Sequence, residues 1–409
     1  MTSVDDFKLL DPATLAEPYE FWSALRESAP IHHTAEGAGF TIVTRYDDVV
    51  TAIRDTETFS NQISRRFKGG MSPYEDSAQV KEILKDGCPY SDALAFVDGD
   101  VHAKHRRMIR RGFTNTRVRE LDEYIHDVVH RLLDEMPFGE PVDFWKQFCV
   151  RLPVLMIGHI LGVDEQHEQD VKRWADAQVA RFGEPRETED ENISIAKDLV
   201  DFHQYLYREL AARRAEPRDD FLSDLVNAEE ETTENELVLI CAQLLVAGAE
   251  SSTSLIGSMV NEIVDRPELL ERLRHDEYLV KDVVEETLRT ESPIKLVHRI
   301  TTRDTVLGGV EIPADTVCML MIASANRDDA MFEDAAVFDD DRRDAKRHLA
   351  FGMGAHLCSG AELARSEARI ALQALLERTT SITRAPGHTS EHIPNLTVRA
   401  LRDLKLVLR

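Results

Sequence analysis

The chain has 409 residues, of which 43% are hydrophobic and 30% charged, which is ordinary globular usage and excludes a disordered or fibrous protein. Its formal net charge of -26 argues against nucleic acid as a partner, because phosphate binding needs an excess of lysine and arginine. Its five cysteines include no C-x-x-C pair, so neither a disulfide scaffold nor a structural zinc site is predicted.

The hydropathy pattern gives no sign of export or of a membrane span. Residues 1–6 lack the basic and apolar regions of a signal peptide. The most apolar stretch, residues 237–249, contains Gln243 and is shorter than the ~20 residues that a spanning helix needs. We therefore expect a cytoplasmic protein that contacts no membrane.

Strands and one long loop are predicted outside the helical part of the chain. The pattern favours a strand at 40–44 and two more within 305–320, where Gly308 and Gly309 form a tight turn. Residues 59–98 show little periodicity and contain several glycines and prolines, which is typical of a long functional loop. The sheet should be small and peripheral.

A helical segment beginning near residue 98 carries a local excess of positive charge. His102 and Arg106 are four residues apart and therefore lie on one face of this helix. We interpret His105 as a solvated histidine. The cations between residues 104 and 119 form a basic patch: Lys104, Arg106, Arg107, Arg110, Arg111, Arg117 and Arg119.

Helices dominate residues 116–290. Apolar residues recur at three- and four-residue spacing in segments such as 118–136 and 193–214. No internal repeat, low-complexity tract or domain boundary interrupts the chain. We therefore expect one mainly α domain over residues 1–409, with small peripheral β-sheets.

A long helix is predicted from the capping-box pair Thr233 and Glu236 to a point before Pro267. Inside it, Gly248 costs about 1 kcal/mol relative to alanine, and Glu250 is an acid in an apolar run. A site for a small ligand would explain both residues. An exposed polar helix face explains this segment equally well when the segment is taken alone.

The strongest motif is FGMGAHLCSG at residues 351–360, which a helical pattern follows directly. Gly352, Gly354 and Gly360 allow the backbone to turn and to lie against a flat ligand. Cys358 stands at the helix entrance, where the helix N-terminus favours the thiolate that binds metal. The alternative is an unrelated buried cysteine, but such a match arises by chance in on the order of one in a million chains.

This motif resembles the haem-binding loop of the cytochrome P450 family, and the resemblance extends over residues 18–409. It implies the family's mainly α fold around a haem b, with Cys358 as the proximal iron ligand in a loop that includes Phe351 and the three glycines. A thiolate ligand favours O–O cleavage, so the resemblance implies oxygenation rather than oxygen carriage.

The resemblance also gives roles to residues on two helices. Glu250 and Ser251 match the acid–alcohol pair that relays protons to dioxygen. The family more often has threonine at the alcohol position, and serine lacks the methyl group that restricts its rotamer. Glu286 and Arg289, alone typical of an exposed pair, match the family's buried E-x-x-R pair, which a further arginine joins. That arginine is Arg342, with Arg343 as the alternative.

Two larger sets match positions that contact the haem propionates and the substrate. Lys295 in the second set is interpreted as a solvated lysine in preference to a partner of a substrate carboxylate. The propionate set is His102, Arg106, Arg299 and His356, and the substrate set is Val246, Ala247, Lys295, Leu296 and Val297.

The implied reaction inserts one oxygen atom from O2 into a mostly apolar small organic substrate. The chain has no flavin or iron–sulfur motif, so the resemblance implies a separate ferredoxin and an NAD(P)H-dependent ferredoxin reductase. We expect Lys104, Arg107, Arg110 and Arg111 to face solvent and to dock the acidic donor. A peroxygenase would share Cys358 without needing Glu250 or Ser251, and a haem sensor would typically carry a second protein ligand.

Overall fold

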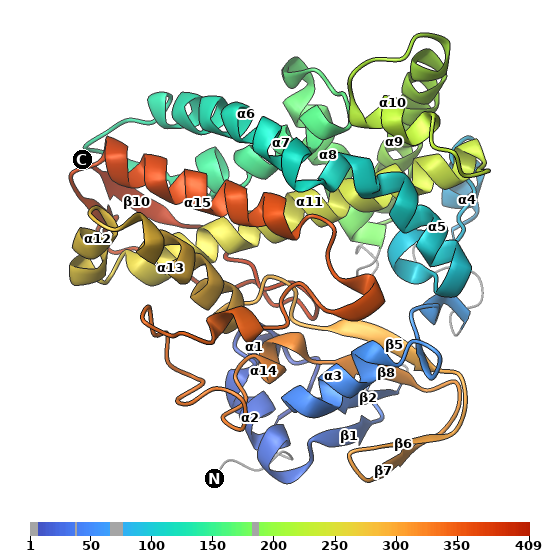
Figure 1. Ribbon diagram of the computed structural model, residues 1–409, viewed down its shortest axis with the longest axis horizontal. Coiled ribbons are helices and arrows are strands. Elements are labelled where there is room, and N and C mark those ends of the chain that lie inside the picture. The colour runs from blue at the N-terminus through green and yellow to red at the C-terminus, as the bar shows by residue number, and fades with distance from the viewer. Residues whose placement is uncertain (1–6, 37–38, 66–76, 182–187) are drawn as a thin grey trace. The chain divides into compact units, whose positions relative to one another are not determined.

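The computed structural model describes residues 7–36, 39–65, 77–181 and 188–409 (Figure 1). Helix makes up 56% of the structure, which confirms the predicted mainly α class. The chain forms two compact units. Unit 1 contains residues 1–61, 121–152 and 251–409, and unit 2 contains residues 62–120 and 153–250.

Unit 1 contains a five-stranded sheet in the order β1-β2-β8-β5-β3, and Figure 1 shows β1, β2, β8 and β5 side by side. Neighbouring strands are antiparallel except for the parallel pair β2 and β8. The predicted strand at 40–44 is confirmed as β2. The strands are β1 (Ile31–Thr34), β2 (Phe40–Val43), β3 (Phe59–Ser60), β5 (Val297–Thr301) and β8 (Val317–Leu320).

Both faces of this sheet are buried because its central strands are apolar on both sides. Successive side chains of a strand point to opposite faces. Ile42 and Met319, which are paired in register, pack with Trp22 of α2. Val43 and Leu320, the next pair, pack with Ile53 of α3. The sheet therefore contributes to two separate hydrophobic clusters of unit 1.

The other strands of unit 1 form two small sheets. The predicted turn is confirmed, since Gly308 and Gly309 have φ values of 54° and 82° and join a two-stranded hairpin. Such left-handed positions suit glycine, because it has no Cβ. The hairpin is β6 (Thr305–Leu307) and β7 (Val310–Ile312), and the three-stranded sheet is β4 (Pro141–Asp143), β10 (Lys405–Leu408) and β9 (Ile382–Arg384).

Helices form the rest of unit 1. The helical pattern predicted after residue 360 is confirmed as α15, which buries Leu363, Ile370 and Ala374 and packs against α13. The helices are α1 (Pro12–Ala16), α2 (Tyr19–Ser28), α3 (Tyr46–Arg54), α12 (Pro267–Leu273), α13 (Glu277–Thr290), α14 (Ile322–Ala325) and α15 (Ala361–Arg378).

Unit 2 is helical, and α4 and α8 pack against α9 around Val80, Ala177 and Leu199. The prediction that residues 59–98 form one long loop is wrong in part, because α4 lies within them and Ser77 caps its start. Residues 66–76 of that loop lie outside the described residues. The helices are α4 (Ala78–Leu84), α5 (Gly99–Ile109), α8 (Glu168–Arg181), α9 (Glu189–Ala215) and α10 (Phe221–Val226).

Three helices run from one unit into the other: α6 (Asn115–Asp134), α7 (Arg151–Ile160) and α11 (Glu234–Ile263). The capping box predicted for α11 is present, because the amide of Thr233 donates to Glu236 (2.9 Å) and the amide of Glu236 donates to the Thr233 hydroxyl (3.2 Å). By length and composition α11 could cross a membrane, but 67% of its most apolar window is buried, as in a core helix.

Candidate functional site

Cys358 lies in a curled loop of unit 1 between the single-turn helix η9 (Gly354–His356) and α15. The amide of Cys358 donates to the carbonyl of Phe351 (2.9 Å), which closes the loop on itself. Gly352 and Gly354 have φ values of 66° and 68°, where a side chain would be strained. The glycines therefore fix a turn that ends with the sulfur three residues before α15.

Cys358 differs from the other cysteines in its exposure, because the remaining four are buried. Burial raises the pKa of Cys241 and Cys318 to about 12, which keeps those thiols protonated and inert. Beside Cys358 the apolar side chain of Leu357 is 47% exposed, and a Cβ added to Gly354 would meet no atom within 4 Å. An accessible sulfur beside an exposed apolar side chain fits a flat apolar group that carries a metal.

Two of the predicted propionate cations also belong to unit 1. Arg299 lies on β5 and is buried, and its guanidinium donates to the carbonyl of His298 (2.7 Å). His356 ends η9, two residues before Cys358, and is half-buried. The loop that carries the sulfur thus also carries a potential cation.

Glu250 and Ser251 lie next to each other on α11, and both are half-buried. Burial raises the pKa of Glu250, with Lys172 opposing and Asp176 adding to the increase. A packing contact explains Gly248, since a Cβ there would lie 3.1 Å from Ile157 of α7. The glycine is needed for close approach of α7 and α11, so a ligand is not needed to explain it.

The other predicted propionate cations lie on α5 in unit 2, where His102 is buried and Arg106 half-buried. The interpretation of His105 as solvated is wrong. His105 is 1% exposed, accepts the amide of Leu94 (3.1 Å) and lies 3.4 Å from Glu236. A buried histidine with a hydrogen bond on each ring nitrogen is a packing residue of unit 2.

Only some cations of the basic patch are exposed to solvent. Lys104 does not face solvent as predicted, because its ammonium pairs with Glu236 at 2.8 Å. Burial opposes ionisation of Glu236, but the hydrogen bonds from Lys104, Thr233, Thr232 and His105 lower its pKa to about 2. Arg107, Arg110 and Arg111 are exposed, although Arg107 pairs with Glu230 (2.8 Å).

Glu286 and Arg289 form a buried pair on α13, with two hydrogen bonds of 2.8 and 2.6 Å. Arg342 is the further arginine, because its Nε donates to Glu286 (3.1 Å) while Arg343 is exposed. The remaining donors of Arg289 bind the carbonyls of Asn326, Ala335 and Val337. The pair therefore fixes the chain between residues 326 and 342.

A second buried acid, Glu285, lies directly before this pair and was not predicted from the sequence. It accepts two hydrogen bonds from Arg365 of α15, at 2.6 and 3.1 Å, and lies 3.3 Å from Nε2 of His348. Arg365 in turn covers the ring of Phe351 at 4.6 Å. The signal for this cluster was weak, because Glu285 and Arg365 look like ordinary solvated helix residues.

The predicted substrate residues differ in how deeply they are buried. Val246 is half-buried and Ala247 exposed on α11, Val297 is half-buried at the start of β5, and Leu296 is buried in the core. The interpretation of Lys295 as solvated is wrong. Lys295 is 1% exposed, and its ammonium donates to the carbonyls of Leu15 (2.8 Å) and Asn395.

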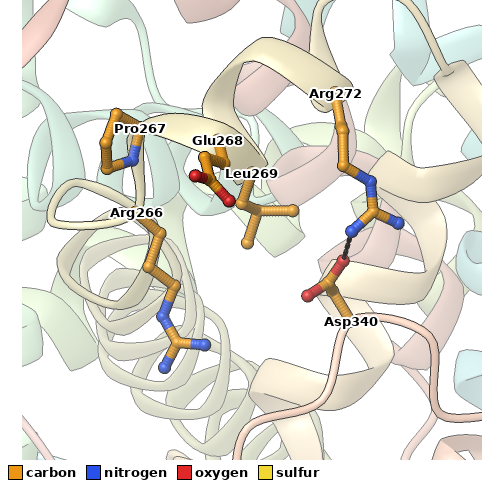
Figure 2. Close-up of a pocket in the computed structure, with 6 residues that line it drawn as sticks. All are labelled: Arg266, Pro267, Glu268, Leu269, Arg272 and Asp340. Carbon is orange, nitrogen blue, oxygen red and sulfur yellow. Dashed lines mark hydrogen bonds and ion pairs between the residues drawn. The ribbon is translucent and has the colours of Figure 1, made fainter.

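A surface pocket of about 360 Å³ lies beside α12 in unit 1 (Figure 2). Arg272 in this pocket pairs with Asp340 (2.5 Å) and Asp341 (2.8 Å), and Arg266 pairs with Glu262 (2.8 Å). Each arginine is thus already neutralised by a carboxylate of the chain. The pocket offers little to an anionic ligand.

Comparisons with known proteins identify the family of the chain. The family model for cytochrome P450 matches residues 169–386. A cytochrome P450 of Bacillus subtilis (strain 168) is 30% identical over 99% of this chain and 98% of its own length. The structure of CYP109Q5 from Chondromyces apiculatus is 33% identical with a TM-score of 0.85 and covers 98% of each chain. Cytochrome P450 CREJ, in complex with (4-ethylphenyl) dihydrogen phosphate, is 28% identical with a TM-score of 0.90 and covers 100% of each chain.

Proposed function

The chain belongs to the cytochrome P450 family and is a cytochrome P450 monooxygenase, and from this premise we propose that Cys358 is the thiolate ligand of a haem b iron. The observation that carries the proposal is the exposed sulfur of Cys358 in a glycine-fixed loop at the start of α15. The family implies the haem iron, dioxygen and redox partners. The individual residue roles are our proposal.

The bound haem iron would supply the activation of dioxygen. The chain's own contribution is to hold the sulfur and to place protons. Phe351, Gly352, Gly354 and Gly360 shape the loop that presents Cys358. The cations proposed to hold the propionates are His102, Arg106, Arg299 and His356, and arginine suits this task because it can bond a carboxylate with two parallel donors.

Glu250 and Ser251 are proposed to deliver protons. Burial raises the pKa of Glu250, so this carboxyl group holds a proton at a higher pH than an exposed glutamate does. Ser251, as the next residue of α11, provides a hydroxyl that can pass the proton on. A Glu250→Gln variant should therefore lose product formation per electron consumed, while substrate binding stays unchanged.

We propose a mostly apolar small organic substrate that contacts Val246, Ala247, Leu296 and Val297. Lys295 is not proposed to bind a substrate carboxylate, because its ammonium donates to two backbone carbonyls. The relative CREJ binds an aryl phosphate, so anionic aromatic compounds belong in a substrate screen beside neutral ones. Wild type and Lys295→Met should bind anionic and neutral compounds with equal spectral binding constants. That result would support the proposal that Lys295 does not contact the substrate.

Electrons are proposed to come from a ferredoxin and its NAD(P)H-dependent reductase. Arg110 and Arg111 are exposed cations of unit 2 that an acidic donor can approach. Charge reversal at both positions should slow reduction by the ferredoxin at low salt, and the difference should shrink as salt is added. Reversal at Arg54, an exposed arginine of α3, is the matched control. Unchanged reduction rates in the Arg110 and Arg111 variant would remove the proposed docking surface.

We further propose that residues 1–409 act as one cytoplasmic monooxygenase domain. We expect the haem-loaded protein to unfold in a single cooperative transition. Circular dichroism and the Soret band should both report this transition at the same midpoint. Two separate transitions would contradict the single-domain proposal.

The decisive test of the proposed ligand is the difference spectrum of the dithionite-reduced protein with and without carbon monoxide. Wild type should show a Soret band far to the red, which is diagnostic of thiolate ligation. Cys358→His should lose that band, while Cys88→Ala, which changes a buried cysteine, should keep it. A wild-type band at the position given by histidine ligation would overturn the assignment of Cys358.

A further inference from the structure

Phe351 begins the loop of Cys358 and is held by side chains from two other segments. The guanidinium of Arg365, from α15, lies over its ring at 4.6 Å from the centroid. The ring of His348 lies 5.7 Å away at an angle of 53°. The carbonyl of the same Phe351 accepts the amide of Cys358 (2.9 Å). Whatever fixes Arg365 and His348 therefore also fixes the residue to which the cysteine is tied.

Glu285 binds Arg365 directly and lies against the ring of His348. Its carboxylate accepts from Nε (2.6 Å) and Nη2 (3.1 Å) of Arg365, in the paired geometry that orients a guanidinium plane. Its second oxygen lies 3.3 Å from Nε2 of His348. The side chain of Glu285 is only 6% exposed, so these partners have little competition from water. Burial opposes its ionisation, but the contacts with His348 and Arg365 lower its pKa to about 2.

His348 has a defined hydrogen position in this arrangement. Its Nδ1 accepts the amide of Ala350 (3.1 Å), so in the neutral ring the hydrogen is on Nε2, which faces Glu285. The next amide, that of Leu349, donates to the side chain of Asn326 (2.7 Å). The segment that enters the cysteine loop is thus anchored at successive residues.

We propose that Glu285 is a positioning residue for Cys358, acting through Arg365, His348 and Phe351. The proposal rests on the proposed role of Cys358 as the iron ligand. Two adjacent acids of α13 then serve different segments: Glu286 holds the chain at 326–342, and Glu285 holds the loop at 348–358. Loss of the Glu285 carboxylate lets Phe351 shift, and the amide of Cys358 loses its fixed acceptor.

The test compares Glu285→Gln with Glu362→Gln. Glu362 is a matched control because it pairs with the same Arg365 (2.9 Å) but is 60% exposed. The readout is the carbon monoxide complex of the reduced protein, followed over time for conversion of the red-shifted Soret band to an unshifted one. Glu285→Gln should convert on the order of tenfold faster than wild type, whereas Glu362→Gln should match wild type.

Circular dichroism separates positioning from general stability. The faster conversion is expected at temperatures at which the variant remains folded, and a conversion that occurs only together with unfolding would overturn the proposal. Equal conversion rates for Glu285→Gln and wild type, or equal acceleration by Glu362→Gln, would also overturn it. If Glu285→Gln does not load haem, Arg365→Lys serves instead, because it keeps the charge but loses the paired donors. A conversion rate equal to that of wild type in Arg365→Lys would overturn the proposal.

The same spectra distinguish failure of the proposal from failure of the proposed function. Absence of a red-shifted band in wild type would overturn both. A normal wild-type band that converts at the same rate in all variants would overturn only the role of Glu285.

Discussion

Two charged regions of this molecule look alike in sequence and differ in burial. In unit 1, Glu286 and Arg289 are 1% and 0% exposed, and the arginine also binds three backbone carbonyls. In unit 2, Arg107 pairs with Glu230 through a single contact and is 59% exposed. A buried pair with full hydrogen bonding fixes the chain around it, whereas an exposed pair is screened by water and salt. Burial, not the number of charges, therefore separates a structural region from one that can attract a partner.

The largest effect is expected at Arg289. Arg289→Ala removes two hydrogen bonds of Glu286 and leaves the carbonyls of Ala335 and Val337 without this donor. We expect the free energy of unfolding to fall by about 3–5 kcal/mol, because Glu286 stays buried and, among the described residues, keeps Arg342 as its one charged partner. Denaturant unfolding followed by circular dichroism measures it. Arg343→Ala, at an exposed position, should change stability by less than about 0.5 kcal/mol.

The second largest effect is expected in the free energy of unfolding at acidic pH. The contacts of Glu285 lower its pKa from 4.5 to about 2, so its stabilisation is complete above about pH 5 and is lost as the pH falls toward 2. The shift corresponds to about 3 kcal/mol. The stability of Glu285→Gln should therefore depend less on pH than that of wild type between these values. Glu236→Gln should show a smaller, salt-sensitive difference, although the pKa of Glu236 is equally low, because its side chain is 26% exposed. Equal differences for the two variants would contradict the importance of burial.

A buried lysine without a carboxylate partner should give a pH effect of the same sign, but in the alkaline range. Burial lowers the pKa of Lys295 to about 7, with Arg399 adding and Glu17 opposing. The unfolded chain then binds more protons than the folded one between pH 7 and 10, so stability rises with pH in that window. Relative to Lys295→Met, wild type should gain at least about 1 kcal/mol from pH 7 to 10. A constant difference between wild type and Lys295→Met would show that the ammonium keeps an ordinary pKa.

The smallest effect is expected at the exposed pair. Arg107→Gln should lower stability by less than about 1 kcal/mol, and the difference should vanish in high salt. Thermal unfolding at low and high salt measures it. A loss as large as that of Arg289→Ala would erase the contrast between the two regions.

Local rules predicted much of the fold. The hairpin turn at Gly308 and Gly309, the capping box at Thr233 and the helix that follows residue 360 all depend on neighbours a few residues away. The loop of Cys358 belongs to the same class, because its shape follows from glycines within the motif. Proximity in sequence made these features predictable.

Apart from α4, which lies in a segment predicted as a loop, the errors concern polar residues whose partners are distant in sequence. His105 bonds Glu236, 131 residues away, and Lys295 bonds Leu15, 280 residues away. Glu285 and Arg365 are 80 residues apart. Helical periodicity cannot reveal such partners, although the apolar neighbours Ile294 and Leu296 were a signal that Lys295 is buried.

The contrast among the five cysteines has a practical chemical consequence. Four thiols are buried, so an alkylating reagent under native conditions should modify one sulfur, that of Cys358. Coordination of that sulfur to a metal would remove it from reaction. The number of labelled thiols per chain, read by mass spectrometry, would then count the fraction of molecules that lack the cofactor, independently of any absorbance.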